Sequence, residues 1–346
     1  MPYQRAPEEL GDLLVDEPGY RIDQLRDWLY KTPVMRADDM TNLPLTLRAE
    51  IGPRLWPFQV EVEQSADEGT TRKWLFRAHD GAAIEAVLMG YSRRATLCIS
   101  SQAGCALACT FCATGQFGFE RHLSAGEIVA QVAYAQAYLR QIGMPGAPDH
   151  VTNIVFMGMG EPLANYDRVR EAIRRMVEIM GLSARSITVS TVGMVPGIHR
   201  LADEPWPVYL AISLHAADDE LRTSLVPINK RYPIAELEAA ARSYFDKKGR
   251  RISIEWTMMD GVNDTLDQAD KLASIAKRLR AHVNLIALNP TPLSTERASS
   301  RLHIEEFATA LKRRGVNVTI RDTRGRDIDA ACGQLRVLSL ISREGR

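Results

Sequence analysis

The spacing of hydrophobic residues divides the chain into three parts. In residues 1–55 large apolar side chains recur at helical spacing, as at Leu25 and Leu29, which predicts short helices. Between residues 58 and 90 apolar and polar positions alternate instead, a period typical of strands in an antiparallel sheet. The sequence therefore predicts a small N-terminal helical unit at 1–55 and a β extension at 56–92.

Strands and helices alternate over the third part, residues 93–346. Short continuous apolar runs, typical of parallel strands covered on both faces, lie at 95–100, 153–157, 186–191, 208–213, 252–258, 283–288 and 316–321. Helical stretches lie at 124–142, 167–180, 234–248, 264–280 and 303–314. The first helical stretch opens on Ser124-Ala-Gly-Glu127, a capping-box pattern. This alternation predicts an α/β domain with a parallel sheet, open or barrel-like, whose chemistry lies on loops that follow the strands.

The composition is that of a globular protein, with 45% hydrophobic and 25% charged residues among 346. Its 43 basic and 43 acidic residues give a net charge of zero, so a nucleic-acid partner would have to be held by a local basic face. No apolar run approaches a membrane span, and the first residues lack the apolar segment of a secretory signal. We therefore expect a cytoplasmic protein with no membrane partner.

Three of the five cysteines, Cys105, Cys109 and Cys112, form a C-x3-C-x2-C loop. An odd number of cysteines clustered at short spacing favours a metal site over a disulfide framework. Three thiolates hold three irons of a 4Fe–4S cube, which usually has four cysteine ligands, and leave one iron open for a substrate. The alternative is a zinc site with His122 as fourth ligand. Structural zinc usually takes a second C-x2-C pair, and the sequence has none, so iron–sulfur is favoured.

The cysteine loop follows the first strand of the α/β domain and has Phe111 before its last cysteine, and so resembles the radical S-adenosylmethionine (SAM) superfamily. Five further segments resemble the RlmN/Cfr family of radical SAM RNA adenine methyltransferases, specifically its C2-methylating branch. They are Gly158-Met159-Gly160-Glu161-Pro162, Ser190-Thr191-Val192-Gly193, Ser213-Leu214-His215-Ala216, Leu288-Asn289-Pro290 and the run from Arg324 to Gly333. The resemblance covers nearly the whole chain. It implies a partial (β/α)6 radical-SAM barrel with a small N-terminal helical domain and a β extension.

The resemblance also implies where the cofactors bind. One 4Fe–4S cluster per chain would be held by the three loop cysteines, and the amino and carboxylate groups of SAM would chelate its open iron. The implied SAM contacts are Gly160, Glu161, Ser190, Ser213, Leu214, His215 and Asn289. Two of these have a physical rationale of their own, because glycine permits close backbone approach and a carboxylate accepts hydrogen bonds from an ammonium group. Without the resemblance, the segment Ser213-Leu214-His215 would be interpreted as packing at the end of a strand.

Three further residues are implied as catalytic: Glu85, Cys98 and Cys332. Cys332 would take a methyl group from one SAM, and a 5′-deoxyadenosyl radical from a second SAM would remove a hydrogen from that methyl. The carbon radical would add to adenine C2, Glu85 would remove the C2 proton, and Cys98 would attack the Cys332 sulfur to release the base. From the pattern alone, Cys98 is a small buried apolar residue and Glu85 an outward-facing residue of an alternating strand. The charged, glycine-rich flanks of Cys332 favour a reactive thiolate.

The implied substrates are an adenosine of 23S rRNA near the peptidyl-transferase centre and an adenosine beside the anticodon of tRNA. The resemblance implies a flavodoxin or ferredoxin as electron donor, and we expect a monomer with an RNA-docking role for the N-terminal unit. Candidate contacts to the RNA backbone are Arg72, Lys73, Arg93, Arg94, Arg121, His122, Arg297, Arg301 and Arg324. Two alternatives stay open: methylation at adenine C8, as in the Cfr branch, and a non-catalytic RNA-binding protein stabilised by a metal.

Overall fold

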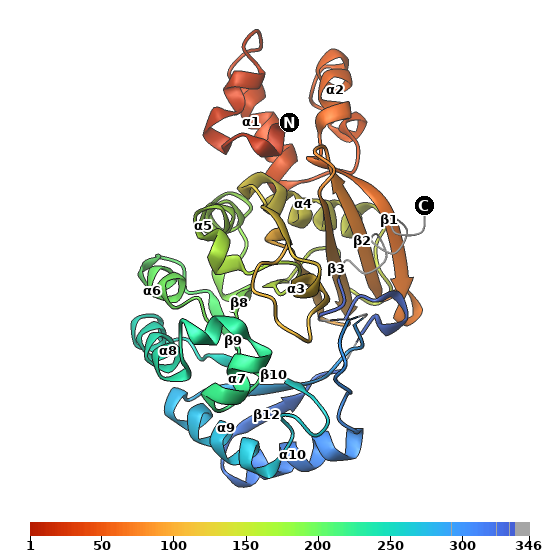
Figure 1. The fold of residues 1–346 in the computed structure, drawn as a ribbon. Coiled ribbons are helices and arrows are strands. Elements are labelled where there is room, and N and C mark those ends of the chain that lie inside the picture. The colour runs from red at the N-terminus through yellow and green to blue at the C-terminus, as the bar shows by residue number, and fades with distance from the viewer. Residues whose placement is uncertain (292, 323, 332, 336–346) are drawn as a thin grey trace.

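The computed structural model describes residues 1–291, 293–322, 324–331 and 333–335. Its main feature is a ten-stranded sheet in the order β1-β2-β3-β4-β7-β8-β9-β10-β11-β12 (Figure 1). The strands are β1 (Phe58–Ala66), β2 (Thr71–Ala78), β3 (Ala83–Tyr91), β4 (Arg94–Cys98), β7 (Asn153–Phe156), β8 (Ile187–Thr191), β9 (Tyr209–Ser213), β10 (Ser253–Met258), β11 (His282–Ala287) and β12 (Asn317–Ile320). The first four pair antiparallel, and β4 and β7 to β12 pair parallel.

The parallel strands are the seven predicted from the apolar runs, with ends that differ by at most two residues. The helices that follow them are α4 (Ala125–Gln141), α5 (Tyr166–Arg174), α6 (Val195–Asp203), α7 (Asp219–Leu225), α8 (Ile234–Lys248), α9 (Leu266–Leu279) and α10 (Arg301–Arg313). Six strand–helix units followed by β12 confirm the partial (β/α)6 barrel. In the described part of the chain no pairing joins β12 back to the first strands, so the barrel is open.

Helices α6 and α7 are elements that the periodicity did not predict. Helix α6 contains Pro196 in its first turn and Gly197 beside it, residues that usually mark a loop. The structure explains the glycine, because a Cβ there would lie 2.7 Å from Cβ of Leu163. The close approach of α6 to the loop after β7 therefore requires a residue without a side chain.

The N-terminal unit is helical, as predicted, and it packs on the barrel. Its α-helices are α1 (Tyr20–Arg26) and α2 (Leu45–Ile51), joined by shorter helical turns. The carbonyl of Tyr3 accepts a hydrogen bond from Arg175 at 3.1 Å, and a Cβ at Gly126 of α4 would lie 2.0 Å from the same oxygen. The predicted β extension continues the barrel sheet through the β3–β4 pair rather than forming a separate layer. The division into domains at 1–55, 56–92 and 93–346 stays a prediction.

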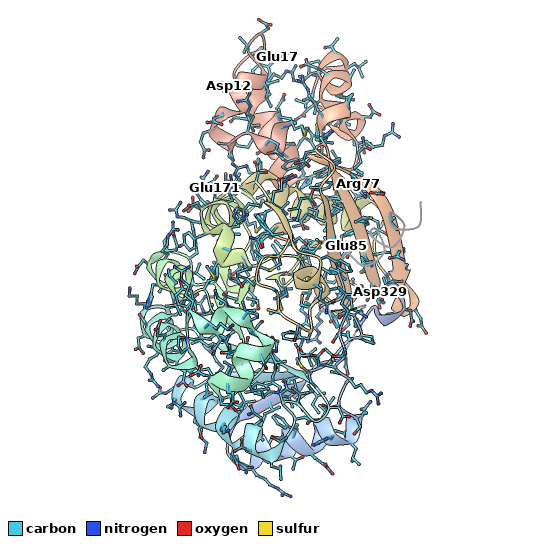
Figure 2. The ribbon with its side chains drawn as sticks, in the orientation of Figure 1. Asp12, Glu17, Arg77, Glu85, Glu171 and Asp329 are labelled. Carbon is cyan, nitrogen blue, oxygen red and sulfur yellow. The ribbon has the colours of Figure 1, made fainter. Side chains whose placement is uncertain are left out.

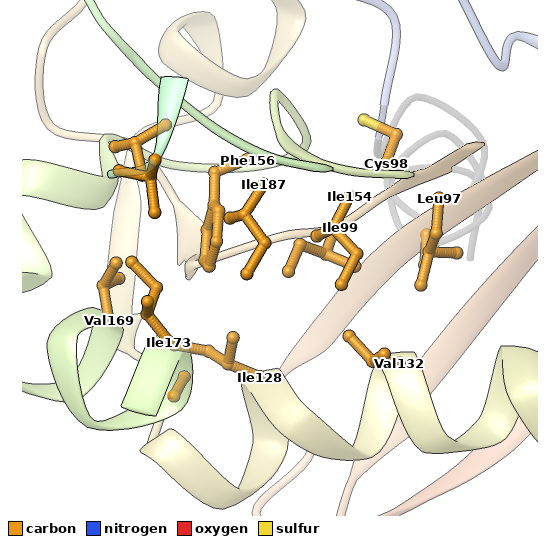
Figure 3. Close-up of a cluster of buried hydrophobic side chains, with 14 of the residues drawn as sticks. Leu97, Cys98, Ile99, Ile128, Val132, Ile154, Phe156, Val169, Ile173 and Ile187 are labelled. Carbon is orange, nitrogen blue, oxygen red and sulfur yellow. The ribbon is translucent and has the colours of Figure 1, made fainter. Parts of the chain in front are cut away.

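Helix α4 covers the sheet where the antiparallel and parallel parts meet. Its predicted capping box is present, with Ser124 Oγ accepting from the Glu127 amide at 3.1 Å and Glu127 Oε2 from the Ser124 amide at 2.8 Å. Leu97 and Ile99 point toward this helix, whereas the sulfur of Cys98 points to the opposite face of the sheet (Figure 3). Strand alternation thus places Cys98 on the inside of the barrel. Among the described residues, no helix has the length and apolar character needed to cross a membrane.

Candidate active site

The cysteine loop lies between β5 (Gln102–Gly104) and the short helix α3 (Ala113–Gln116). Gly104 has φ +73°, and a Cβ at this position would lie 2.0 Å from the Gly118 carbonyl oxygen. That same carbonyl accepts a hydrogen bond from the Cys105 amide at 2.8 Å. The tight approach of the two chain segments therefore needs glycine, and it fixes the start of the loop against β6 (Phe119–His122).

The three cysteines of this loop line one cavity of about 980 Å³, which we call the first cavity. It lies at the carboxyl ends of the parallel strands, as expected for a barrel of this kind. Of the predicted SAM contacts, the first cavity is lined by Gly160, Glu161, Ser190, Ser213, His215 and Asn289. Leu214 does not line it: its amide donates to the Glu255 carbonyl at 3.1 Å, and its side chain lies in the hydrophobic core.

The buried thiols favour a cluster over a single ion. Burial raises the pKa of Cys105 to about 12 and that of Cys109 well above its usual range, with the charge of nearby Cys112 adding to both. A bound cation removes this cost, because it stabilises the thiolates. The proposed zinc ligand His122 does not line the cavity and instead contacts Gln102 at 3.0 Å.

Glu161 is a buried carboxylate on the loop after β7. Its Oε1 accepts from the Leu163 amide and its Oε2 from the Val192 amide, each at 3.0 Å. Burial raises its pKa to about 7, although these two hydrogen bonds act in the opposite direction. Gly160 has φ +95°, and a Cβ there would lie 2.4 Å from Cβ of Gln102. The glycine therefore allows the loop to place a carboxylate that an ammonium group would stabilise.

His215 lies in the first cavity as a neutral hydrogen-bond donor. Its Nδ1 accepts from the Thr257 amide at 3.0 Å, so the remaining proton is on Nε2. Burial lowers its pKa to about 3, and the neighbouring Arg222 guanidinium adds to this effect. The ring packs edge-on against Phe111 with centroids 4.6 Å apart. Phe111 thus lines the cavity beside the cysteine loop.

A second cavity of about 1320 Å³ adjoins the first. The two share Met157, Ile286 and Asn289 as lining residues. Cys98 lines the second cavity together with Val87, which is its cross-strand partner on β3. The sequence alone placed Cys98 in the core, and the structure adds that it borders a cavity.

The C-terminal segment runs between the two cavities. Ala331 lines the second cavity, Gly333 lines the first, and the Gly333 carbonyl accepts from the Ala113 amide at 2.7 Å. Cys332, the predicted methyl acceptor, lies outside the described residues. Its two neighbours in the chain nevertheless connect this segment with both cavities and with the end of the cysteine loop.

Glu85 is buried on β3, not outward-facing as the alternating pattern alone indicated. It shares a face of the strand with Val87, which lines the second cavity. Its carboxylate Oε1 lies 3.5 Å from Nζ of Lys73, and its backbone carbonyl accepts from Ser100 Oγ at 2.6 Å.

The comparison with known proteins agrees with this geometry. Residues 99–273 match the Radical SAM superfamily. A protein from Parafrankia sp. (strain EAN1pec) is 49% identical, with 99% of this chain and 95% of that protein covered. One from Rhodococcus opacus (strain B4) is 51% identical, with 96% and 91% covered. Both are named "Probable dual-specificity RNA methyltransferase RlmN". This chain belongs to the RlmN family.

The RlmN assignment extends to three dimensions. The crystal structure of a radical SAM methyltransferase from Sphaerobacter thermophilus matches with a TM-score of 0.90 and 48% identity, covering 97% of this chain and 98% of that one. The protein is therefore a radical SAM RNA methyltransferase, which uses an iron–sulfur cluster and SAM and acts on RNA.

The RlmN site includes a buried cation that the sequence did not reveal. Arg222 of α7 is completely buried, and its Nε donates to the Leu214 carbonyl at 3.1 Å while its Nη2 donates to the Val192 carbonyl. These hydrogen bonds tie together the loops that follow β8 and β9. Burial lowers the Arg222 pKa to about 10, and the charge of Cys109 acts in the opposite direction. An arginine on a short polar helix gives no local sign that it is buried.

Two of the residues predicted to contact RNA are paired or buried within this RlmN fold. Arg121 forms ion pairs with Glu127, at 2.7 Å, and with Asp80. Lys73, interpreted from sequence as a surface charge, is buried. These two residues are therefore less suited to bind phosphate than the arginines around the second cavity.

Proposed function

We propose that this RlmN-family enzyme methylates C2 of adenosine in 23S rRNA and in tRNA by way of a methylated Cys332. The observation that carries the proposal is the pair of adjoining cavities, around which lie cysteines with three different proposed roles. The first cavity is lined by the three loop cysteines and by Gly333, and the second by Cys98 and Ala331, so the described neighbours of Cys332 in the chain border both. The names of the relatives favour dual specificity for RNA substrates and the RlmN branch.

In this proposal Cys105, Cys109 and Cys112 hold a single 4Fe–4S cluster, and the first cavity holds SAM. When bound, these groups supply a methyl group in one round and a hydrogen-abstracting radical in the next. Glu161 would receive the SAM ammonium group, since its carboxylate is the acidic group next to Gly160 on the cavity wall. Ser190 and Ser213, whose Oγ atoms lie 3.3 Å apart, and the Nε2–H of His215 offer further polar contacts.

The protein side chains would carry the rest of the reaction. The Cys332 thiolate displaces S-adenosylhomocysteine from SAM and becomes a methyl thioether. After hydrogen abstraction, the methylene carbon would bond to adenine C2, and the adduct would return one electron to the oxidised iron–sulfur cluster. The Glu85 carboxylate then takes the C2 proton. Cys98 attacks the Cys332 sulfur, so that a disulfide forms as the carbon–sulfur bond breaks and the carbon takes a proton; two electrons from a flavodoxin- or ferredoxin-like donor reopen the disulfide.

The second cavity is the proposed site for the adenosine, which has to leave its base stack to enter. Its lining includes Tyr91, Arg94 and Arg324. The guanidinium groups of Arg94 and Arg324 lie 4.3 and 4.4 Å from the centre of the Tyr91 ring. Positive charge held beside an aromatic ring is suited to a phosphodiester and an unstacked base. The N-terminal helical unit would dock the remainder of the RNA.

Anaerobic reconstitution with iron, sulfide, SAM, a reductant and an rRNA fragment tests the proposal. Mass spectrometry of the digested RNA should show C2-methyladenosine. C8-methyladenosine would move the enzyme to the Cfr type. A reconstituted brown protein that releases 5′-deoxyadenosine but leaves the RNA unmethylated would overturn the proposal, and a colourless zinc protein would support the metal-stabilised RNA-binding alternative.

A further inference from the structure

Lys73 of β2 is a buried lysine next to the proposed base. Its side chain is only 3% exposed, as is that of Glu85, and buried lysines occur almost only where they are paired. The strand register places Lys73 opposite Val87 and Leu75 opposite Glu85, so Lys73 and Glu85 are diagonal neighbours on one face of the sheet. Nζ of Lys73 lies 3.5 Å from Oε1 of Glu85.

The ion pair bears on the protonation state of Glu85. A carboxylate that is removed from water without a partner tends to take up a proton, and a protonated carboxylic acid cannot act as a base. An ammonium group within 4 Å favours the ionised form. Lys73 therefore provides the charge that allows Glu85 to be both buried and ready to accept the C2 proton.

Lys73 has a second contact, to the C-terminal segment. Its Nζ donates to the Asp329 carbonyl at 3.3 Å, three residues before Cys332 in the chain. Glu85 on β3 and Asp329 at the end of the C-terminal segment lie on the same side of the molecule (Figure 2). The same segment is fixed at Gly325, whose amide donates to Asp67 Oδ2 at 3.0 Å. One ammonium group thus joins the strand that bears the base to the segment that leads to Cys332.

We infer that Lys73 is a positioning residue, which keeps Glu85 ionised and holds it in register with the Cys332 segment. The inference rests on the proposed function and adds to it a residue that would act through Glu85 without contact to SAM or to the adenine. In the proton-transfer step Glu85 takes the C2 proton and becomes neutral. Lys73 is therefore needed after the methyl group has been loaded onto Cys332.

A double-mutant cycle tests this inference, with K73M, E85Q and the double variant K73M/E85Q. Three products are measured: methyl-Cys332 in the absence of RNA, the covalent protein–RNA adduct, and methyladenosine. E85Q removes the carboxylate that takes the C2 proton and should slow methyladenosine formation by about 100-fold or more. K73M should slow it by about 10-fold or more. Both should accumulate the adduct and still methylate Cys332. In the E85Q background, K73M should change the rate by less than about twofold, because it acts through Glu85.

Two controls separate positioning from a general loss of structure. R77M removes a cation from the same strand, where Arg77 pairs with Glu61 of β1, and should keep normal turnover. K73R retains the positive charge and should recover part of the activity lost in K73M. Normal turnover of the K73M enzyme would overturn the inference. So would a K73M substitution that slows the E85Q enzyme by the same factor as it slows the wild type.

Denaturant unfolding of the wild type, K73M, E85Q and K73M/E85Q gives a readout that needs no catalysis. Because removing one partner leaves a buried charge, the double variant should be more stable than the sum of the single effects predicts. Additive effects would show that the two side chains do not interact. That result would overturn this inference but not the proposed function. A wild-type protein that forms no methyladenosine, with the stability coupling intact, would instead overturn the proposed function.

Discussion

The two cavities share lining residues but differ in the charge of the side chains around them. In the first, burial raises the pKa of Glu161 to about 7 and lowers that of His215 to about 3, so the environment favours neutral groups. In the second, Arg94, Arg321 and Arg324 supply permanent positive charge. In the proposed reaction, the first environment would protect radical chemistry from water and side reactions, and the second would suit a polyanion.

The shared lining residues place the two environments side by side, as the proposed reaction requires. Met157, Ile286 and Asn289 border both cavities, and two of these three side chains are apolar. This comparison predicts that substitutions in the first cavity affect every step, whereas those in the second affect only the steps that involve RNA.

The largest expected effect comes from the loop cysteines. Cys109→Ala should lose the cluster and all SAM cleavage, because one of the three proposed ligands is removed. Iron analysis and visible absorbance of the reconstituted protein measure this. Cys332→Ala is the matched control, since it should retain iron while methyl transfer to protein and RNA is abolished. Full iron content in the Cys109 variant would contradict the ligand assignment.

Cys98→Ala should stop the reaction later, after RNA has been attached. Each chain would complete at most one addition, and denaturing gel electrophoresis should show protein that carries RNA. SAM cleavage in the first cavity should continue, because Cys98 lines only the second. If the Cys98 variant released methyladenosine repeatedly, its role in resolving the adduct would be wrong.

The pH dependence of the first cavity should reveal Glu161. Its folded pKa of about 7 lies above the unfolded value of 4.5, so the folded state without SAM binds the extra proton. The contribution of Glu161 to stability should therefore be full below pH 4.5, fall by about 3 kcal/mol as the pH rises to about 7, and stay level above that. Glu161→Gln should remove this contribution, which denaturant titrations at several pH values can measure. SAM affinity should change in the opposite direction and rise with pH, because the ammonium group favours ionised Glu161.

The smallest effect is expected at the rim of the second cavity. Arg94→Gln should raise KM for RNA and reduce the dependence of binding on salt by the equivalent of about one phosphate contact. Methylation of Cys332 in the absence of RNA should not change. Arg93→Gln, at the adjacent exposed position outside the cavity lining, is the control. Equal effects of the two substitutions would indicate a diffuse basic surface rather than a defined contact.

Local signals in the sequence were enough for much of the architecture. The apolar runs gave all seven parallel strands, and the Ser124–Glu127 pattern gave the first helix cap, because both depend on residues close together in the chain. The cysteine loop was also local, as was the pairing of a conformationally permissive Gly160 with a carboxylate. The exceptions are instructive: α6 was missed because its glycine is required by a distant contact, and Leu214 was expected at the cavity but faces the core.

The sequence by itself determined where the parallel strands lie along the chain and the family to which the chain belongs. Only the tertiary structure decided that Lys73 and Arg222 are buried, that Cys98 borders a cavity, and that Glu85 is paired. The physical reason is that burial and charge pairing are set by what packs against a residue. The partners of these residues come from other strands and from the C-terminal segment, whose approach no local periodicity records.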